Sequence, residues 1–414
     1  MAAALVAAAV STALVATPTA DAATDKFFVV PASQVAKAAP GDVLRTREVS
    51  FHVSGINTPI KVTQLVYRTV DALDQPIANV TSVLHPPQAQ RTVRAVAYNS
   101  IYDSLNPEDS PSRAIAGRAT FSSALNTAEV TNIVSLLTAG YTTIISDIEG
   151  PDAHFAAGRE YATTTLDGIR AAGRSSATGV TERTKVALMG YSGGSIATNW
   201  AAALAPSYAP DVNRRLVGAA GGGLLVSPLN NLDYISGSLG WSGVAPMAII
   251  GLARAYNIDP QPYLSARGKQ IFAQLDQAAI PNVLFQYPGL TWKELAKPQY
   301  ADPLAIPPLK KIKDDIDLAQ APTPKIPLFM MQGGGGWQEG TNGSQPGIGA
   351  GDGVMIVKDN NKLLQRYCRT GNRKISYTVI DWAGHNVTML QWGSKAVEWI
   401  GDRFAGRAAP STCR

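Results

Sequence analysis

Residues 44–84 alternate between apolar and polar positions, as in VSFHVSG, IKVTQLVYRTVD and IANVTSVLHP. A period of two is typical of strands that bury one face. Turn-forming residues interrupt the pattern at 55–57 (Gly-Ile-Asn) and at 74–76 (Asp-Gln-Pro). This region therefore predicts an antiparallel meander of strands.

Beyond residue 90 the pattern changes to short apolar strands separated by helix-period segments. The strands are expected at 94–100, 141–147, 185–190, 215–223, 325–333 and 374–382. The helices are expected at 127–139, 158–173, 191–205 (ending before Pro206), 363–368 and 387–404. Strand–helix alternation predicts an α/β fold with a mostly parallel central sheet and helices on both of its faces.

Residues 224–324 do not follow this alternation. They include twenty uncharged, loosely helical residues at 234–253, then helices around 265–279 and a proline-rich return. The glycines and the proline within 234–253 argue against a membrane span. We expect a helical cap or lid at 224–324, inserted into a core formed by residues 23–223 and 325–414.

The N-terminus resembles a secretory leader. The first twenty residues carry no charge and are followed by an A-x-A type cleavage site, Ala20-Asp21-Ala22. The absence of Lys or Arg before Lys26 departs from that pattern. We expect residues 1–22 to be a signal peptide and the mature protein to be extracellular.

Composition narrows the function classes. Charged residues make up 16% of the chain, against about 25% in typical proteins, which excludes a disordered or coiled-coil chain. The formal net charge is +5, yet no basic cluster occurs, so no nucleic-acid partner is expected. Two cysteines, Cys368 and Cys413, are too few for a structural zinc site. In an oxidising compartment they would pair, and two free thiols are the alternative.

Candidate chemistry begins at Gly190-Tyr-Ser192-Gly-Gly194, between a predicted strand and a predicted helix. In this context G-x-S-x-G indicates a nucleophile elbow, a strained turn that exposes the serine hydroxyl. The alternative is a glycine-rich strand–helix turn with an idle serine.

A serine nucleophile needs a base and an acid, which follow it along the chain in this fold. Of the four histidines, His52, His85, His154 and His385, only His385 follows Ser192. It comes just after the last strand and before the terminal helix. The other three are expected to be structural, with His154 placed where it could line a pocket.

The acid is chosen from Asp302, Asp352, Asp359 and Asp381. We favour Asp352, which lies in the loop after the penultimate strand, where the acid can reach the histidine. Asp381 falls inside the last strand, and Asp359 is expected to cap the next helix.

Longer segments around these residues resemble a known family. They are AYNSIYDSLNP, ISDIEGP with LDGIRAA, MGYSGGSIATNWAAALAPSYAPD, GDGVMIV and AGHNVTML, and the resemblance covers about residues 40–410. The chain resembles the secreted lipases typified by Candida antarctica lipase A, with their bacterial branch. The resemblance implies an α/β-hydrolase core with a helical cap, Asp352 as the acid, and a disulfide between Cys368 and Cys413.

The oxyanion hole is expected at two residues. The residue after the nucleophile, Gly193, supplies one backbone N–H in this fold. The family places an aspartate in the loop after the strand 94–100, which corresponds to Asp103, and a protonated carboxyl could donate there. A loop aspartate that makes only a turn hydrogen bond is the alternative.

Residues 333–353 depart from the family, which usually has a short turn there. They contain ten glycines, and the segment is either a surface insertion or a mobile rim with Trp337 contacting substrate.

The sequence thus predicts a secreted serine carboxylesterase or triacylglycerol lipase that forms an acyl-enzyme on a lipid or other lipophilic ester. No metal or organic cofactor is implied, and a transient contact with a lipid interface is compatible with the apolar cap. The oligomeric state is not indicated. An acyltransferase with the same residues, a peptidase, or a catalytically silent binding protein on a hydrolase scaffold are the alternatives.

Overall fold

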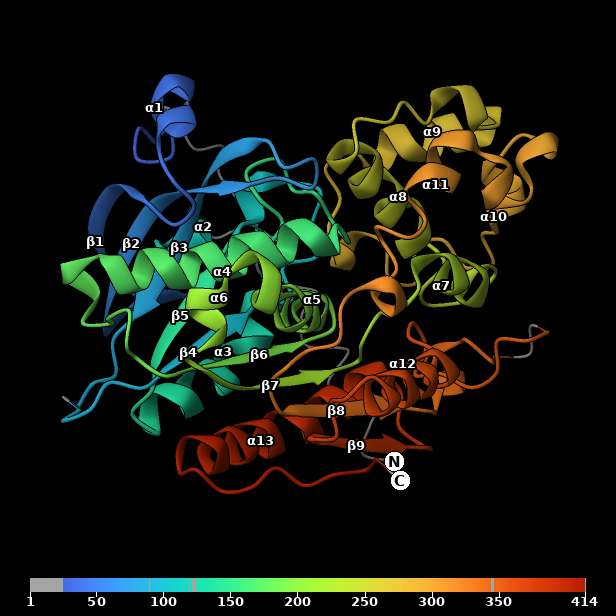
Figure 1. The fold of residues 1–414 in the computed structure, drawn as a ribbon. Coiled ribbons are helices and arrows are strands. Elements are labelled where there is room, and N and C mark those ends of the chain that lie inside the picture. The colour runs from blue at the N-terminus through green and yellow to red at the C-terminus, as the bar shows by residue number, and fades with distance from the viewer. Residues whose placement is uncertain (1–24, 89, 119, 121–123, 344–345, 414) are drawn as a thin grey trace.

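The fold is built on one central sheet of nine strands (Figure 1). The computed structural model describes residues 25–88, 90–118, 120, 124–343 and 346–413, so the predicted signal peptide, 1–22, lies outside the described residues. The strand order is β1-β2-β3-β5-β4-β6-β7-β8-β9. The strands are β1 Val43–Val53, β2 Ile56–Val70, β3 Pro76–Leu84, β4 Ala95–Asn99, β5 Thr142–Ser146, β6 Val186–Tyr191, β7 Leu216–Gly222, β8 Leu328–Gly333 and β9 Ile375–Ile380.

The predicted meander is confirmed as β1, β2 and β3, which pair in antiparallel fashion. β3 then pairs antiparallel with β5, and from β5 to β9 every neighbouring pair is parallel. The parallel strands β4, β5, β6 and β8 are entirely buried, because helices cover both faces, whereas the edge strand β9 is largely half-buried. The carboxyl ends of these strands meet at one edge of the sheet, where loops can collect functional side chains.

Two apolar cores lie on opposite faces of the sheet. One packs α4, α5 and α12 against the strands, and the other packs α3 and α13. Figure 1 shows α4 and α5 in front of the sheet and α13 beneath β8. The core helices are α1 Ala32–Lys37, α2 Pro111–Ile115, α3 Ala124–Thr138, α4 Gly158–Arg174, α5 Gly193–Tyr208, α6 Pro210–Asn213, α12 Val357–Arg369 and α13 His385–Phe404.

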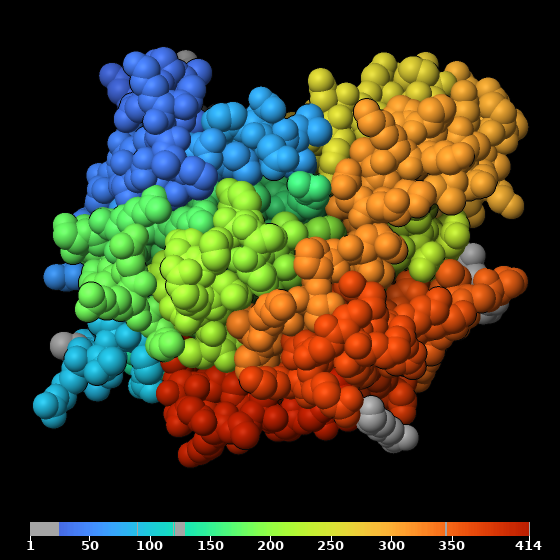
Figure 2. Space-filling view, viewed as in Figure 1, coloured from blue at the N-terminus to red at the C-terminus, as the bar shows by residue number. Residues whose placement is uncertain are grey.

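The chain between β7 and β8 forms a helical cluster, whose apolar core also includes residues from outside this segment, such as Leu105, Phe155 and Met355. Its α-helices are α7 Pro228–Ile235, α8 Val244–Ala255, α9 Ala266–Leu275, α10 Trp292–Leu295 and α11 Pro307–Ile312. Figures 1 and 2 show these yellow and orange segments as a lobe at one end of the molecule. Within the described residues, no helix combines the length and the apolar character needed to cross a bilayer.

The end of α5 differs from the sequence expectation. α5 does not end before Pro206 but continues to Tyr208, with the proline inside its last turn. Proline has no backbone N–H and therefore removes one helical hydrogen bond. The loss is small here, because the helix ends within the same turn. The added turn carries the chain to α6.

The C-terminal tail is fixed to the edge of the sheet beside β9. A disulfide joins Cys368 of α12 to Cys413, with 5.6 Å between the two Cα atoms. The Thr412 N–H donates to the Ile375 carbonyl at 2.7 Å. The cysteines are therefore paired, and the alternative of two free thiols is wrong for this structure.

Candidate active site

Ser192 lies on a strained turn between β6 and α5, at φ 53° and ψ −122°. Glycines make this turn sterically feasible: a Cβ on Gly190 would lie 2.2 Å from the Gly194 carbonyl oxygen, and a Cβ on Gly194 would lie 2.0 Å from that of Asn99. Such strain in a non-glycine residue persists where the surroundings impose it. The geometry is that of the predicted elbow, with the serine at the carboxyl edge of the sheet.

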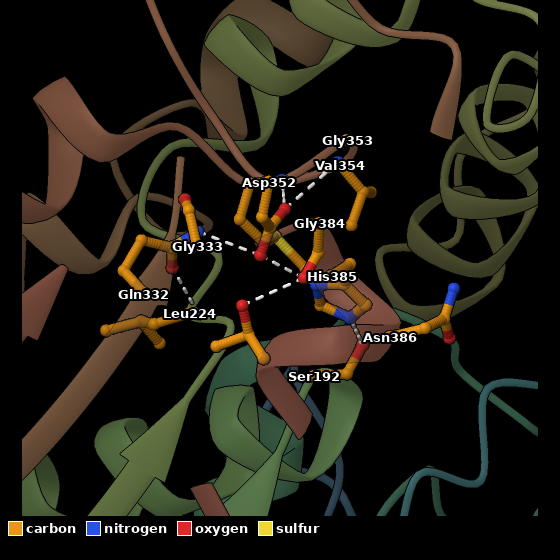
Figure 3. A network of polar contacts seen from close by, with 12 residues as sticks. Ser192, Leu224, Gln332, Gly333, Asp352, Gly353, Val354, Gly384, His385 and Asn386 are labelled. Atoms are coloured by element: carbon orange, nitrogen blue, oxygen red, sulfur yellow. Dashed lines mark hydrogen bonds and ion pairs between the residues drawn. The ribbon is translucent and has the colours of Figure 1, made fainter. Parts of the chain in front are cut away.

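His385 contacts the serine hydroxyl directly, with Nε2 2.8 Å from Ser192 Oγ (Figure 3). The histidine was expected before the terminal helix, but it is the first residue of α13. Tyr191 holds it from the sheet side, because the tyrosine hydroxyl donates to the His385 carbonyl at 2.7 Å and the two rings are 5.0 Å apart. The imidazole is therefore fixed at a helix N-terminus, pointing at the elbow.

Asp352 is fully buried and contacts the other imidazole nitrogen, with Oδ2 2.8 Å from His385 Nδ1. Oδ2 also accepts from Gln332 Nε2 at 2.8 Å. Oδ1 accepts the backbone N–H groups of Met355 at 2.7 Å and Val354 at 3.1 Å. Four hydrogen bonds to one carboxylate fix its orientation toward the histidine.

The remaining acid candidates lie elsewhere. Asp302 accepts the Leu304 N–H at the start of the 3-10 turn Pro303–Ala305, and Asp381 is exposed just beyond the end of β9, not inside it. The prediction that the Asp359 side chain caps the N-terminus of α12 is wrong. This residue lies in the first turn of α12 and makes no capping hydrogen bond. Its carboxylate instead accepts from Asn230 Nδ2 of α7 at 2.8 Å.

Asp103 and Gly193 face one another across the elbow. Asp103 adopts φ 39°, and its Oδ1 is buried without a hydrogen-bond partner. A Cβ on Gly193 would lie 1.7 Å from that oxygen, so the two residues are in contact only because position 193 is glycine. The first residue of α5 and a carboxyl oxygen without a partner thus lie together and line the same pocket as Ser192.

The helical cluster between β7 and β8 holds the loop that carries Asp103. The Ile280 N–H donates to the Asp103 carbonyl at 3.1 Å, and the Leu105 N–H donates to the Ala278 carbonyl at 2.8 Å. On the core side, Glu149 accepts the Ser104 N–H at 3.4 Å. The positive φ of Asp103 is therefore maintained from both sides.

Burial and neighbouring charges perturb both titratable groups beside the serine. Burial raises the pKa of Asp103 to about 7, against the opposing effect of His385. Burial alone lowers the pKa of the His385 imidazole, but Asp352, followed by Glu339 and Asp103, raises it, and the net pKa lies above its usual range. A carboxyl that holds its proton near neutrality can donate a hydrogen bond.

A pocket lies beside these residues, at the helical cluster between β7 and β8. Its lining is apolar except for the side chains of Asp103, Ser192 and Asn231. α7 and α8 each contribute part of the walls, and Phe155 and Ala156 contribute another part from outside the segment between β7 and β8. Such a cavity accepts a hydrocarbon group and brings it to the serine.

The other histidines lie away from the serine contact. His52 Nδ1 is 2.9 Å from the Ser50 carbonyl, and His85 Nε2 is 2.9 Å from Thr63 Oγ1. His154 Nδ1 is 2.7 Å from Glu160 Oε2, and His154 is not among the pocket-lining residues.

Residues near the site that the sequence did not indicate include Gln332, Tyr191, Trp241 and Glu339. The sequence could have indicated only Glu339, since Glu339 and Asp352 are the only charged residues between Gly333 and Gly353.

The glycine-rich segment packs against the site backbone. A 3-10 turn, η8, spans Gly336–Glu339. A Cβ on Gly335 would lie 2.1 Å from the Trp382 carbonyl oxygen, and a Cβ on Gly351 would lie 2.2 Å from that of Met355. Trp337 is 68% exposed and is not among the pocket-lining residues. Residues 344 and 345 lie outside the described part.

Comparisons with known proteins agree on one family. Residues 116–412 match the model of the secretory lipase family. Lipase 10 of Candida albicans is 30% identical over 94% of this chain and 83% of its own length. A probable inactive lipase of Mycobacterium tuberculosis is 28% identical over 92% and 82%. The closed-state crystal structure of Candida antarctica lipase A superposes with a TM-score of 0.81 at 26% identity, over 94% of this chain and 88% of that one.

Proposed function

The chain belongs to the secretory lipase family, and from this premise we propose that it hydrolyses lipophilic carboxylic esters through a triad of Ser192, His385 and Asp352. It is a hydrolase of the lipase and esterase type with an α/β-hydrolase fold. The observation that carries the triad is the unbroken contact from Ser192 Oγ through His385 to Asp352, with both distances at 2.8 Å.

The order of proton transfers follows from these contacts. Asp352 accepts from His385 Nδ1–H, which leaves Nε2 free to accept the Ser192 hydroxyl proton as the oxygen attacks the ester carbonyl. The imidazolium then returns the proton to the leaving alcohol, and an acyl-enzyme remains on Ser192. Water, activated by the same imidazole, releases the acid.

The oxyanion of the tetrahedral intermediate would be stabilised by two donors. The Gly193 N–H lies at the N-terminus of α5, where the helix dipole also favours negative charge. We assign the second donor to the protonated Asp103 carboxyl, whose unpaired Oδ1 and raised pKa support the role.

The acyl chain of the substrate would occupy the pocket under the cap. A second hollow, lined only by apolar residues and Tyr263, lies further inside the cap. Ile249, Leu252 and Leu309 line both hollows and form the wall between them. Together they favour acyl esters over peptides, which would need polar subsites for their amide groups.

We propose residues 224–324 as the cap domain of this enzyme and residues 23–223 with 325–414 as its core. We also propose that the protein is secreted. The disulfide between Cys368 and Cys413 and the family's description support secretion, since structural disulfides persist in oxidising compartments.

Contact with a lipid interface is supported by four exposed apolar side chains beside the site. Leu239 and Phe285 are each 60% exposed, Trp337 68% and Trp382 58%. The loops that carry them adjoin one another through backbone hydrogen bonds: the Leu239 N–H donates to the Gly340 carbonyl at 3.1 Å, the Phe285 N–H to the Gly240 carbonyl at 3.0 Å, and the Gly335 N–H to the Ala383 carbonyl at 2.9 Å. Large exposed aromatic residues are typical of surfaces that meet lipid.

A catalytically silent protein is the second candidate, because one relative is described as a probable inactive lipase. The complete contact from Ser192 to Asp352 argues against it here. An acyltransferase would use the same residues and transfer the acyl group to an alcohol, so product ratios with and without an added alcohol separate it from a hydrolase.

The direct test combines hydrolysis of p-nitrophenyl esters of graded chain length with the Ser192→Ala variant. We expect wild-type activity that increases from acetate toward medium-length acyl chains and is lost in the variant. Activity that persists in a folded Ser192→Ala protein would refute the proposal.

A further inference from the structure

Three backbone N–H groups open α13, and each has an acceptor from outside the helix. The Gly384 N–H donates to Gln338 Oε1 at 3.2 Å, the His385 N–H to the Asp352 carbonyl at 2.7 Å, and the Asn386 N–H to Glu339 Oε1 at 2.9 Å. First-turn N–H groups lack partners inside a helix, and the N-cap residue here, Gly384, has no side chain to supply one. The glycine-rich segment 333–353 provides all three acceptors at the helix end that carries His385.

The second oxygen of Glu339 reaches the cap. Oε2 accepts from Trp241 Nε1 at 2.9 Å, and the Trp241 ring lies edge-on to the His385 imidazole, with 5.3 Å between centroids and 81° between planes. Trp241 also lines the substrate pocket. One carboxylate, 8% exposed, therefore joins the helix that carries the base to the cap residue that packs against the base.

Two glycines leave the space that this carboxylate occupies. A Cβ on Gly384 would lie 2.6 Å from Glu339 Oε1, and a Cβ on Gly353 would lie 3.1 Å from Oε2. Gly353 also has φ +123°, which L side chains rarely adopt. The glycine-rich sequence thus allows a charged side chain to approach the helix end that carries the base.

We propose that Glu339 is a positioning residue for the histidine, which orients the His385 ring and places a second negative charge beside the imidazolium formed during catalysis. This inference rests on the proposed function. Glu339 is not expected to touch substrate, because both of its oxygens are engaged by N–H donors of the protein.

The titratable groups around His385 come from four elements. Asp352 faces it from the loop before α12, Glu339 from η8, Asp103 from the loop after β4, and Tyr191 from β6. Burial raises the pKa of Glu339, and the charge of His385 lowers it. The two N–H donors on Glu339 suit its ionised form, which accepts hydrogen bonds and donates none.

The test is the pH dependence of kcat/KM for Glu339→Gln in the full chain, with p-nitrophenyl butyrate as substrate. Loss of the negative charge lowers the pKa of His385, so the acid limb of the profile moves to lower pH, by about one unit for a neighbouring buried charge. The same loss of imidazolium stabilisation reduces kcat by about tenfold.

A matched control is Glu398→Gln, an exposed residue on the same helix, which removes an equal charge away from the base. Its profile is expected to coincide with the wild type. An acid limb that stays in place in Glu339→Gln, whatever its activity, would overturn the inference, because a merely structural defect lowers activity without moving the limb.

If Glu339→Gln does not fold, Glu339→Asp carries the test. It keeps the charge one methylene further from His385, so a smaller shift in the same direction is expected, and an unmoved limb would again overturn the inference. Labelling of wild-type Ser192 with a fluorophosphonate separates this inference from the proposed function. Absent labelling refutes the function, whereas normal labelling with an unmoved limb refutes only the role of Glu339.

Discussion

Replacement of Asp103 by Asn and by Ala tests the carboxyl that we assign to the oxyanion hole. The pKa of Asp103 is about 7, so about nine-tenths of the molecules hold the proton at pH 6 and about one-tenth at pH 8. A carboxyl that must donate therefore predicts an alkaline limb, with kcat/KM falling by about tenfold for each pH unit well above 7. Asparagine donates at every pH, so the Asn variant should lose that limb.

Alanine at position 103 leaves only the Gly193 N–H for the oxyanion. Loss of one such donor costs about 10²–10³ in kcat. The assay is hydrolysis of p-nitrophenyl butyrate between pH 5 and 9, with thermal unfolding to confirm that each variant is folded. Near-wild-type activity in a folded Asp103→Ala protein would refute the assignment, as would an alkaline limb that survives in Asp103→Asn.

Three further perturbations address the acid, the pocket and the disulfide. Asp352→Asn should lower kcat by about 10⁴, because the histidine loses its orienting acceptor, while Asp359→Asn should not; a reversed result would move the acid to Asp359. Ala248→Trp, in the pocket lining, should lower the ratio of kcat/KM for p-nitrophenyl decanoate over acetate by about tenfold, and an unchanged ratio would place the acyl chain elsewhere. Cys413→Ser should reduce the free energy of unfolding by about 4 kcal/mol, because it removes the disulfide to Cys368, which closes a loop over a sequence separation of 45. Denaturation curves that coincide with the wild type would contradict this prediction.

Much of the fold could be predicted because the hydrophobic pattern is strong. The buried parallel strands are short apolar runs, and helices cover both faces, so the alternation in the sequence reports the layers directly. The ends of helices could be predicted less well, because the local helix propensity of the residues does not decide where a helix ends. Pro206 remains inside α5. The Asp359 carboxylate accepts a hydrogen bond from Asn230 instead of capping its own helix.

The three candidate catalytic residues could also be predicted, since chain order and loop position select Ser192, His385 and Asp352. Their supporting contacts were not, because they depend on tertiary packing. Nothing local shows that Trp241, 144 positions before His385, lies edge-on to its ring. The sequence indicates a surface insertion or a mobile rim at the glycine-rich segment, but several of its glycines allow backbone segments to pack closely, and this brings Glu339 to the base.

The central claim is that Ser192 is a nucleophile activated by His385. Its most direct test is mass spectrometry of the intact protein and its peptides after reaction with a fluorophosphonate. We predict one adduct per chain, on the peptide that contains Ser192, and much slower labelling in His385→Ala. An unlabelled folded protein, or an adduct on another serine, would contradict the account.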